Sequence, residues 1–293
     1  GSVPGGMNKH VSMADRELLQ SNVQQMILWS QDAVDIAKQL HAQNPAMYDS
    51  FGSFRSNMLS LVRADGAMDL YDGVLRARDT GGKIILDRAS DQSYLELIEE
   101  EVRPWTYMKF PHLRSLGREA GWYRVGPLAR VQNCDFIPSP LAEVQRQEFI
   151  AWGKGEPVHA TLAYHWARMI EVLHTVEVIK DLLDDPDILA GELMTDGVRR
   201  GEGVGVIEAP RGTLIHHYRV GTLFALVGAH ADGAATVEQD FLDRLVEPDG
   251  NAEFLRHARH PGGERVATSD RMPDAVLVFE EREDRKKARA LER

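Results

Sequence analysis

Cysteine is nearly absent from this chain of 293 residues, which contains Cys134 and no other. One thiol cannot close a disulfide within the chain, so a disulfide framework is excluded and a reducing, cytoplasmic location is expected. The same count excludes Cys-x-x-Cys pairs, which supply soft metals with thiolate ligands. A lone thiol is usually a small buried apolar residue, and we expect this of Cys134.

Long hydrophobic runs are missing too. The longest uncharged apolar run, Leu223 to Ala229, is far shorter than the roughly 20 residues that cross a bilayer, so no transmembrane helix is expected. Basic residues are in deficit, with 34 Lys and Arg against 45 Asp and Glu and a net charge of -11. This charge repels phosphate backbones and anionic lipid heads, so neither nucleic acid nor a membrane surface is an expected partner.

Several catalytic motifs are also missing. The chain has no Gly-x-Gly-x-x-Gly after a strand, no Walker-type loop, no Gly-x-Ser-x-Gly elbow and no His-Glu-x-x-His. Nucleotide binding by this chain is therefore not expected. His216 and His217 are neighbours whose side chains point in different directions. His165 and His174 are nine residues apart, which is not the spacing of a zinc pair, so we interpret them as core or surface histidines.

Two long helices are predicted. Ser12 and Asp15 form a capping-box pattern that opens an apolar-periodic stretch, about Ala14 to Gln43. A second apolar stripe at three- and four-residue spacing runs from Thr161 to Leu183 and ends before Pro186. We expect these two helices to pack together.

The segment between them is predicted to hold a small sheet. Val74 to Arg78 faces Lys83 to Leu86 across a turn that contains two glycines, which is typical of a β-hairpin or meander. We expect this sheet, near residues 58 to 88, at the edge of the fold. Leu95 to Val102 is predicted to be helical, and an irregular segment rich in glycine and proline follows until helices resume near Leu141. The expected fold class is α+β, mainly α: a long-helix bundle with a small β-hairpin or meander.

The most informative stretch runs from Gly205 to His216 and reads Gly-Val-Ile-Glu-Ala-Pro-Arg-Gly-Thr-Leu-Ile-His. It does not stand alone. Other short motifs accompany it, namely Val3 to Gly6, Ser93 to Leu95, Trp105 to Pro111, Leu116 to Glu119, Arg124 to Arg130 and Trp166 to His174. In type, order and spacing, these residues resemble the large (alpha) subunit of nickel-iron hydrogenases. The likeness covers about residues 2 to 220 and is strongest to the soluble, NAD-linked, bidirectional type.

This resemblance implies site residues. In the family, the arginine of the Pro-Arg-Gly motif lies over the bimetallic site, and here that residue is Arg211. A guanidinium is a permanently charged planar fork whose donors suit an anionic ligand in a dry cavity. The residues that the resemblance places around it, as support behind the metal ligands, are Ala209, Pro210, Gly212 and His216. The alternative for Arg211 is an ordinary ion pair with a carboxylate such as Glu208.

The chain also departs from the family. Two Cys-x-x-Cys pairs hold the nickel-iron centre, with its CO and cyanide ligands, in the complete family, and this sequence has neither. We therefore predict that the chain alone binds no such cofactor and neither oxidises hydrogen nor reduces protons. The partners implied by resemblance are flavin-bearing, NAD-linked diaphorase subunits and an iron-sulfur small subunit.

Two domains are expected: residues 1–220, a partial hydrogenase-like core, and residues 221–293, an unrecognised segment rich in Ala, Arg, Gly and His. Three interpretations remain open. The leading one is a truncated large subunit, active only if the cysteine regions are supplied elsewhere. The second is a non-catalytic interaction or scaffold subunit of a hydrogenase-like or complex I-like assembly. The third is a decayed or misassembled reading frame. A partial core should expose apolar surface where absent parts belong.

Overall fold

A computed structural model describes residues 2–3, 5–189, 192–195, 197–198 and 200–219. The predicted segment 221–293 lies outside these residues. Most of the described chain belongs to one compact unit, residues 1–199 and 204–217, and the description below concerns that unit. The described residues include no helix that is both long and apolar enough to cross a bilayer.

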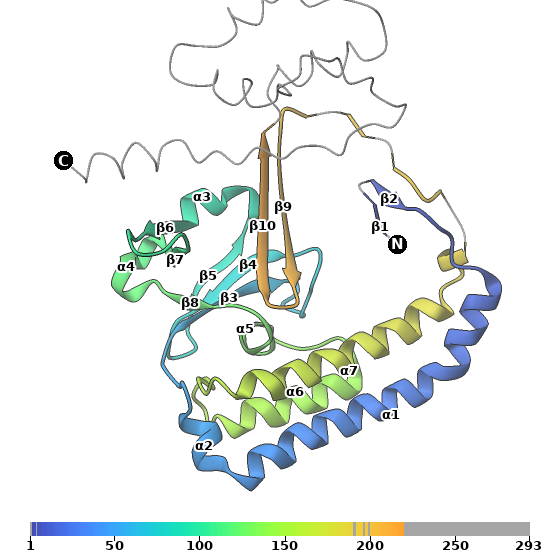
Figure 1. The fold of residues 1–293 in the computed structure, drawn as a ribbon, viewed down its shortest axis with the longest axis horizontal. Helices are drawn as coiled ribbons and strands as arrows, with labels where there is room; N and C mark the ends of the chain where they lie inside the picture. The colour runs from blue at the N-terminus through green and yellow to red at the C-terminus, as the bar shows by residue number, and fades with distance from the viewer. Residues whose placement is uncertain (1, 4, 190–191, 196, 199, 220–293) are drawn as a thin grey trace, which may run out of the picture. The chain divides into compact units, whose positions relative to one another are not determined.

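Three helices run side by side along one layer of this unit (Figure 1). They are α1 (Met13–Gln43), α6 (Pro140–Trp152) and α7 (Ala163–Asp184), and α7 packs against both of the others. The predicted capping box opens α1: the Ser12 hydroxyl accepts from the Asp15 amide at 3.1 Å, and the Ser12 amide donates to the Asp15 carboxylate at 3.3 Å. Both predicted long helices and their packing are confirmed. A short helix, α2 (Pro45–Ser50), follows α1 directly.

The predicted sheet is present and has four strands, in the order β5-β4-β3-β8. The strands are β3 (Asn57–Val62), β4 (Val74–Arg78), β5 (Ile84–Ala89) and β8 (Tyr123–Arg124). The β4–β5 hairpin is confirmed, β3 pairs antiparallel with β4, and β8 adds a parallel pair that the sequence did not predict. The sheet is not a peripheral element, because every residue of β3 is buried and helix α5 (Pro127–Asn133) packs on it.

Two predictions for the middle of the chain were wrong. The stretch expected to be helical from Leu95 to Val102 is helical only as far as Leu97, in the single turn α3 (Tyr94–Leu97), and continues as strand β6 (Ile98–Val102). Pairing with β7 (Lys109–Leu113) overrides the helical propensity of the three consecutive glutamates, one of which, Glu100, bonds Lys109 across the pair at 2.9 Å. Helices α4 (Gly117–Ala120) and α5 lie in the segment expected to be irregular.

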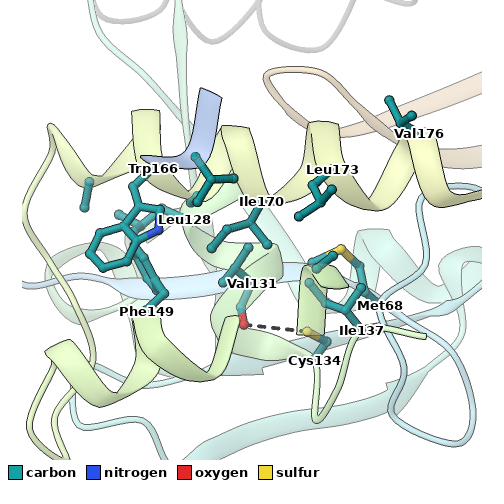
Figure 2. Packing of buried hydrophobic residues seen from close by; sticks show 14 of the residues in the cluster. Met68, Leu128, Val131, Cys134, Ile137, Phe149, Trp166, Ile170, Leu173 and Val176 are labelled. Atoms are coloured by element: carbon teal, nitrogen blue, oxygen red, sulfur yellow. Dashed lines mark hydrogen bonds between the residues drawn. The ribbon is translucent and has the colours of Figure 1, made fainter. Parts of the chain in front are cut away.

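The main core fills the space between the helices and α5 (Figure 2). Phe149, Ile170 and Leu173 are fully enclosed there, and each such side chain contributes about 1.5–3 kcal/mol through burial. Cys134 belongs to this core, as predicted, and its thiol donates to the Val131 carbonyl at 3.6 Å. Burial raises the pKa of this thiol to about 12. A second core lies between the sheet and the β6–β7 pair and includes Leu59, Leu75 and Ile98.

Short elements complete the described chain. Near its start are β1 (Ser2–Val3) and β2 (Gly6–Met7), and the amide of Met7 donates to the carbonyl of Leu193 at 2.8 Å. The 3-10 turns span Asp91–Ser93, Arg114–Leu116 and Pro186–Leu189. The last two strands, β9 (Glu202–Ala209) and β10 (Gly212–Arg219), pair with each other and carry the candidate site.

Candidate functional site

The Pro-Arg-Gly motif forms the turn of a hairpin. Strands β9 and β10 are joined by the two residues Pro210 and Arg211 alone, so the motif lies at the tip of a tight two-stranded ribbon (Figure 1). The ribbon is anchored to the body of the fold through β9, where the amide of Glu208 donates to the carbonyl of Leu70 at 2.8 Å. The sequence identified this motif but not its hairpin.

Two glycines let the turn approach the start of α5. A Cβ added to Gly212 would lie 2.1 Å from Cγ2 of Val125, and a Cβ added to Gly126 would lie 2.6 Å from the carbonyl oxygen of Arg211. Gly126 also has φ +82°, a conformation that other residues rarely adopt. Glycine is therefore required on both sides of this contact.

Beneath the turn lies the buried guanidinium of Arg130, on α5. Its Nε and Nη2 donate to the two carboxylate oxygens of Glu171, on α7, at 2.5 and 2.9 Å. Its Nη1 donates to Glu208 at 2.7 Å and to the carbonyl of Ala209 at 3.0 Å, and Nη2 also reaches the carbonyl of Pro210 at 3.4 Å. One side chain thus joins α5, α7, β9 and the turn, through the planar fork that arginine provides.

Glu208 is equally well satisfied. Its second carboxylate oxygen accepts from the amide of Leu61, on β3, and from the hydroxyl of Thr213, on β10, both at 2.8 Å. Burial raises the pKa of Glu208, and the hydrogen bonds from Arg130, Leu61 and Thr213 oppose that rise. For Arg130, burial acts to lower the pKa, but the two carboxylates outweigh it and the pKa is raised.

A second arginine, Arg168, holds the same turn from α7. It donates to the carboxylate of Glu171 at 2.6 Å and to the carbonyl of Pro210. Burial lowers the pKa of Arg168, while Glu171 acts in the opposite direction. The two arginines and the two glutamates balance in charge, so the base of the turn is neutral as a group.

Arg211 itself is exposed, and its guanidinium has no hydrogen-bond or ion-pair partner among the residues the structure describes. The alternative that Arg211 forms an ion pair with Glu208 is wrong, because both carboxylate oxygens of Glu208 are engaged elsewhere. Arg211 is therefore a positive charge presented at the tip of the hairpin, above a neutral buried base.

The structure brings together only part of the residues that the resemblance named. Ala209, Pro210 and Gly212 form or flank the turn with Arg211, whereas His216 lies further along β10 and is exposed.

The three other histidines considered in the sequence, His165, His174 and His217, lie in different surroundings. His217, next to His216, is half-buried, and its Nδ1 lies 2.8 Å from the hydroxyl of Tyr94. His165 is exposed on α7, whereas His174 is buried with its Nδ1 2.7 Å from the Ser139 hydroxyl. The structure therefore agrees with their interpretation as surface and core histidines.

The described residues do not supply the ligands of a nickel-iron centre. Within them, no group of three or more His, Cys, Asp or Glu side chains is placed to hold a metal. Cys134 cannot act as a soft donor, because its thiol is buried, bonded to a backbone carbonyl and held protonated by its raised pKa. That the isolated chain binds no nickel-iron centre stays a prediction.

The sequence did not predict that charged residues support the turn. These residues are Arg130, Arg168, Glu171 and Glu208. A signal was available for one of them. Glu171 lies directly after Ile170 in an apolar stripe, and an acidic residue there needs a buried partner. The identity of that partner, Arg130, depends on the packing of α5 against α7, which brings together two residues 41 positions apart in the chain.

Comparisons with known proteins find relatives of this chain among hydrogenase subunits. The chain is 39% identical over 254 residues to the beta subunit of the NAD-reducing hydrogenase HoxS of Cupriavidus necator, a match that covers 84% of this chain and 52% of that protein. It is 35% identical over 253 residues to a vhu subunit of the F420-non-reducing hydrogenase of Methanocaldococcus jannaschii, covering 86% and 60%. No protein-family model matches the chain.

Solved structures agree. An NAD+-reducing [NiFe]-hydrogenase in the H2-reduced state matches with a TM-score of 0.71 and 47% identity, over 75% of this chain and 49% of that chain. A [NiFeSe] hydrogenase from Desulfovibrio vulgaris Hildenborough shares the fold at 19% identity, with a TM-score of 0.55. The relatives of this chain are hydrogenase subunits, and its structure matches the large subunit of a nickel-iron hydrogenase. It spans about half the length of the relatives it matches.

Proposed function

We propose that this chain is part of a nickel-iron hydrogenase large subunit, in which the hairpin turn presents Arg211 to an anionic ligand of the metal centre once the cysteine-bearing regions are present. The observation that carries the proposal is the turn itself. Its backbone is fixed by two buried or half-buried arginines, yet its own arginine is left with unused donors. A preorganised cation of this kind stabilises negative charge without a reorganisation cost.

The proposed assembly follows the relatives. In it, α1, α6 and α7 form part of the helical body around the centre, and NAD-linked flavin subunits and an iron-sulfur small subunit complete the enzyme. The reaction would be reversible hydrogen oxidation coupled to NAD through those partners, in the cytoplasm. Residues 1–220 would form the hydrogenase-like part, and 221–293 a separate segment.

A chimera tests this proposal. Residues 3–219 of this chain would replace the matching segment in the large subunit of the Cupriavidus relative, whose remaining segments stay native. We expect hydrogen-dependent NAD reduction and normal nickel content in the assembled chimera. Arg211→Lys should lower kcat about 100-fold, since a lysine lacks the planar fork, while nickel content stays constant. A chimera that assembles with nickel and shows the same rate with Arg211→Lys would overturn the assignment of Arg211.

A second function is favoured by the missing thiolates. A chain whose described residues offer no metal-binding cluster could act as an interaction or scaffold subunit. The purified full chain distinguishes the two: hydrogen-dependent dye reduction or stoichiometric nickel would refute its predicted inactivity. Stable binding to a small iron-sulfur subunit without nickel would favour the scaffold.

A further inference from the structure

We propose that Arg130, Glu208 and Arg168 are positioning residues that fix the backbone of the Pro-Arg-Gly turn and thereby set where Arg211 is presented. This inference deepens the proposed function and depends on it for the role of Arg211. The positioning itself concerns only residues within one compact unit of the chain.

The backbone of the turn is held by hydrogen bonds to its carbonyls. The two carbonyls immediately before Arg211, those of Ala209 and Pro210, accept hydrogen bonds from guanidinium groups that belong to other elements. Backbone groups in a two-residue turn usually face solvent and remain mobile. Here they are held from below by α5 and α7.

The guanidinium of Arg130 is itself held in a fixed orientation. All three of its nitrogens donate, and Glu171 binds it in a two-point, parallel arrangement that fixes the plane of the guanidinium. Glu208 locks the remaining nitrogen and is tied in turn to β3 and β10. The guanidinium plane cannot tilt without breaking several buried hydrogen bonds, so the carbonyls above it cannot move freely.

The side chain of Arg211 has no hydrogen-bond or ion-pair partner among the described residues. Its placement therefore depends on the backbone, and the backbone depends on the network below. A lysine at position 130 would keep the charge but could not serve two carboxylates and two carbonyls at once.

A nitroxide label at position 211 measures this directly in the full chain. In Arg211→Cys the label reacts at that site alone, because the buried thiol of Cys134 has a pKa of about 12. We expect a slow-motion EPR spectrum. Adding Glu208→Gln, Arg130→Lys or Arg168→Gln should shorten the rotational correlation time about twofold or more, since each releases contacts at the turn.

The matched control is Glu177→Gln. Glu177, on α7, is a buried glutamate like Glu208. Its carboxylate accepts hydrogen bonds from the amides of Leu141 and Ala142, away from the turn. Its substitution should leave the EPR spectrum unchanged. The unfolding midpoint of each chain is measured alongside, and Arg168→Gln, at a half-buried position, provides a folded variant if the buried substitutions unfold the chain.

Unchanged label mobility in folded Arg168→Gln and Glu208→Gln chains would overturn the inference, as would an equal loosening by Glu177→Gln. Failure of the proposed function would appear differently: the label would respond as expected, while the chimera described above would assemble with nickel and not depend on Arg211.

Discussion

Arg130 forms ion pairs with two buried carboxylates, those of Glu171 and Glu208. Replacing it with methionine leaves Glu208 buried without a cation and leaves Glu171 with Arg168 alone, and we expect a loss of about 3–5 kcal/mol in the free energy of unfolding. Urea denaturation followed by circular dichroism measures this loss.

Arg63→Met is the matched control for that measurement. Arg63 pairs with Asp65 at the surface, where ion pairs contribute about 0–1 kcal/mol. A loss below about 1 kcal/mol for Arg130→Met would show that Glu171 and Glu208 find other partners or become neutral at little cost.

His174 makes the stability depend on pH. Burial lowers its pKa below the ordinary value of 6.5, with Asp69 opposing the shift. Below pH 6.5 the unfolded chain therefore binds more protons than the folded one, so the free energy of unfolding falls as the pH drops through 6.5 toward the folded-state value. Above pH 6.5 this effect disappears.

The measurement is the free energy of unfolding between pH 5 and 8 for the parent and His174→Gln. Their difference should narrow on acidification, because the variant has no proton to take up at this position. His159, whose pKa is also lowered by burial, contributes equally to both chains and cancels. If the free energy of unfolding changed with pH in the same way for both chains, His174 would not be the cause of the pH dependence.

Helix α1 depends on its capping box at one end. Ser12→Ala removes the acceptor for the Asp15 amide, and we expect about 1 kcal/mol of lost stability and faster hydrogen exchange in the first turn. Ser21→Ala is the control, since Ser21 is exposed on the same helix and its hydroxyl donates to the carbonyl of Leu18 rather than to a helix end. Equal effects of the two substitutions would remove the cap as the cause.

The sequence predicted those elements whose signals are local. The start of α1 follows from Ser12 and Asp15 and its end from Pro45, and α7 follows from apolar periodicity and Pro186. Strand β6 was mistaken for a helix because its consecutive glutamates favour helix, and only pairing with β7 makes it a strand. Helix α5 was missed because all seven of its residues are buried, which removes the alternation between apolar and polar faces.

In the candidate site, too, the sequence predicted the local features and missed the contacts between distant segments. Arg211 and its neighbours could be named from a contiguous motif, because order along the chain is visible in the sequence. The network of Arg130, Glu171 and Glu208 could not, since it joins three segments whose proximity exists only in the folded chain.

At the scale of the whole molecule, one face of helix α1 is an exposed apolar surface, as the sequence led us to expect. The exposed fractions of its large apolar residues are 64% for Leu18, 63% for Trp29, 57% for Ile36 and 46% for Leu40. Beside Ile36 and Leu40 is an apolar pocket of about 360 Å³, also lined by Trp152. Such surface favours association.

We therefore expect the isolated chain to self-associate with rising concentration in sedimentation velocity. Introducing charges with Trp29→Glu and Ile36→Glu should reduce that association, because both side chains lie on the exposed apolar surface, whereas Gln25→Glu at an exposed polar position should not. A monodisperse monomer at every concentration would contradict this prediction.

The pairing of α1 with α7 also sets an order of events during synthesis. About 140 residues separate the end of α1 from the end of α7, so a ribosome working at about 5–20 residues per second needs roughly 7–28 s to make the partner. Throughout that interval Val23, Ile27 and Val34 have no α7 to pack against. The nascent chain is therefore most prone to aggregate, and most dependent on chaperones, before residue 184 is translated, and slow codons between the two helices would lower its yield.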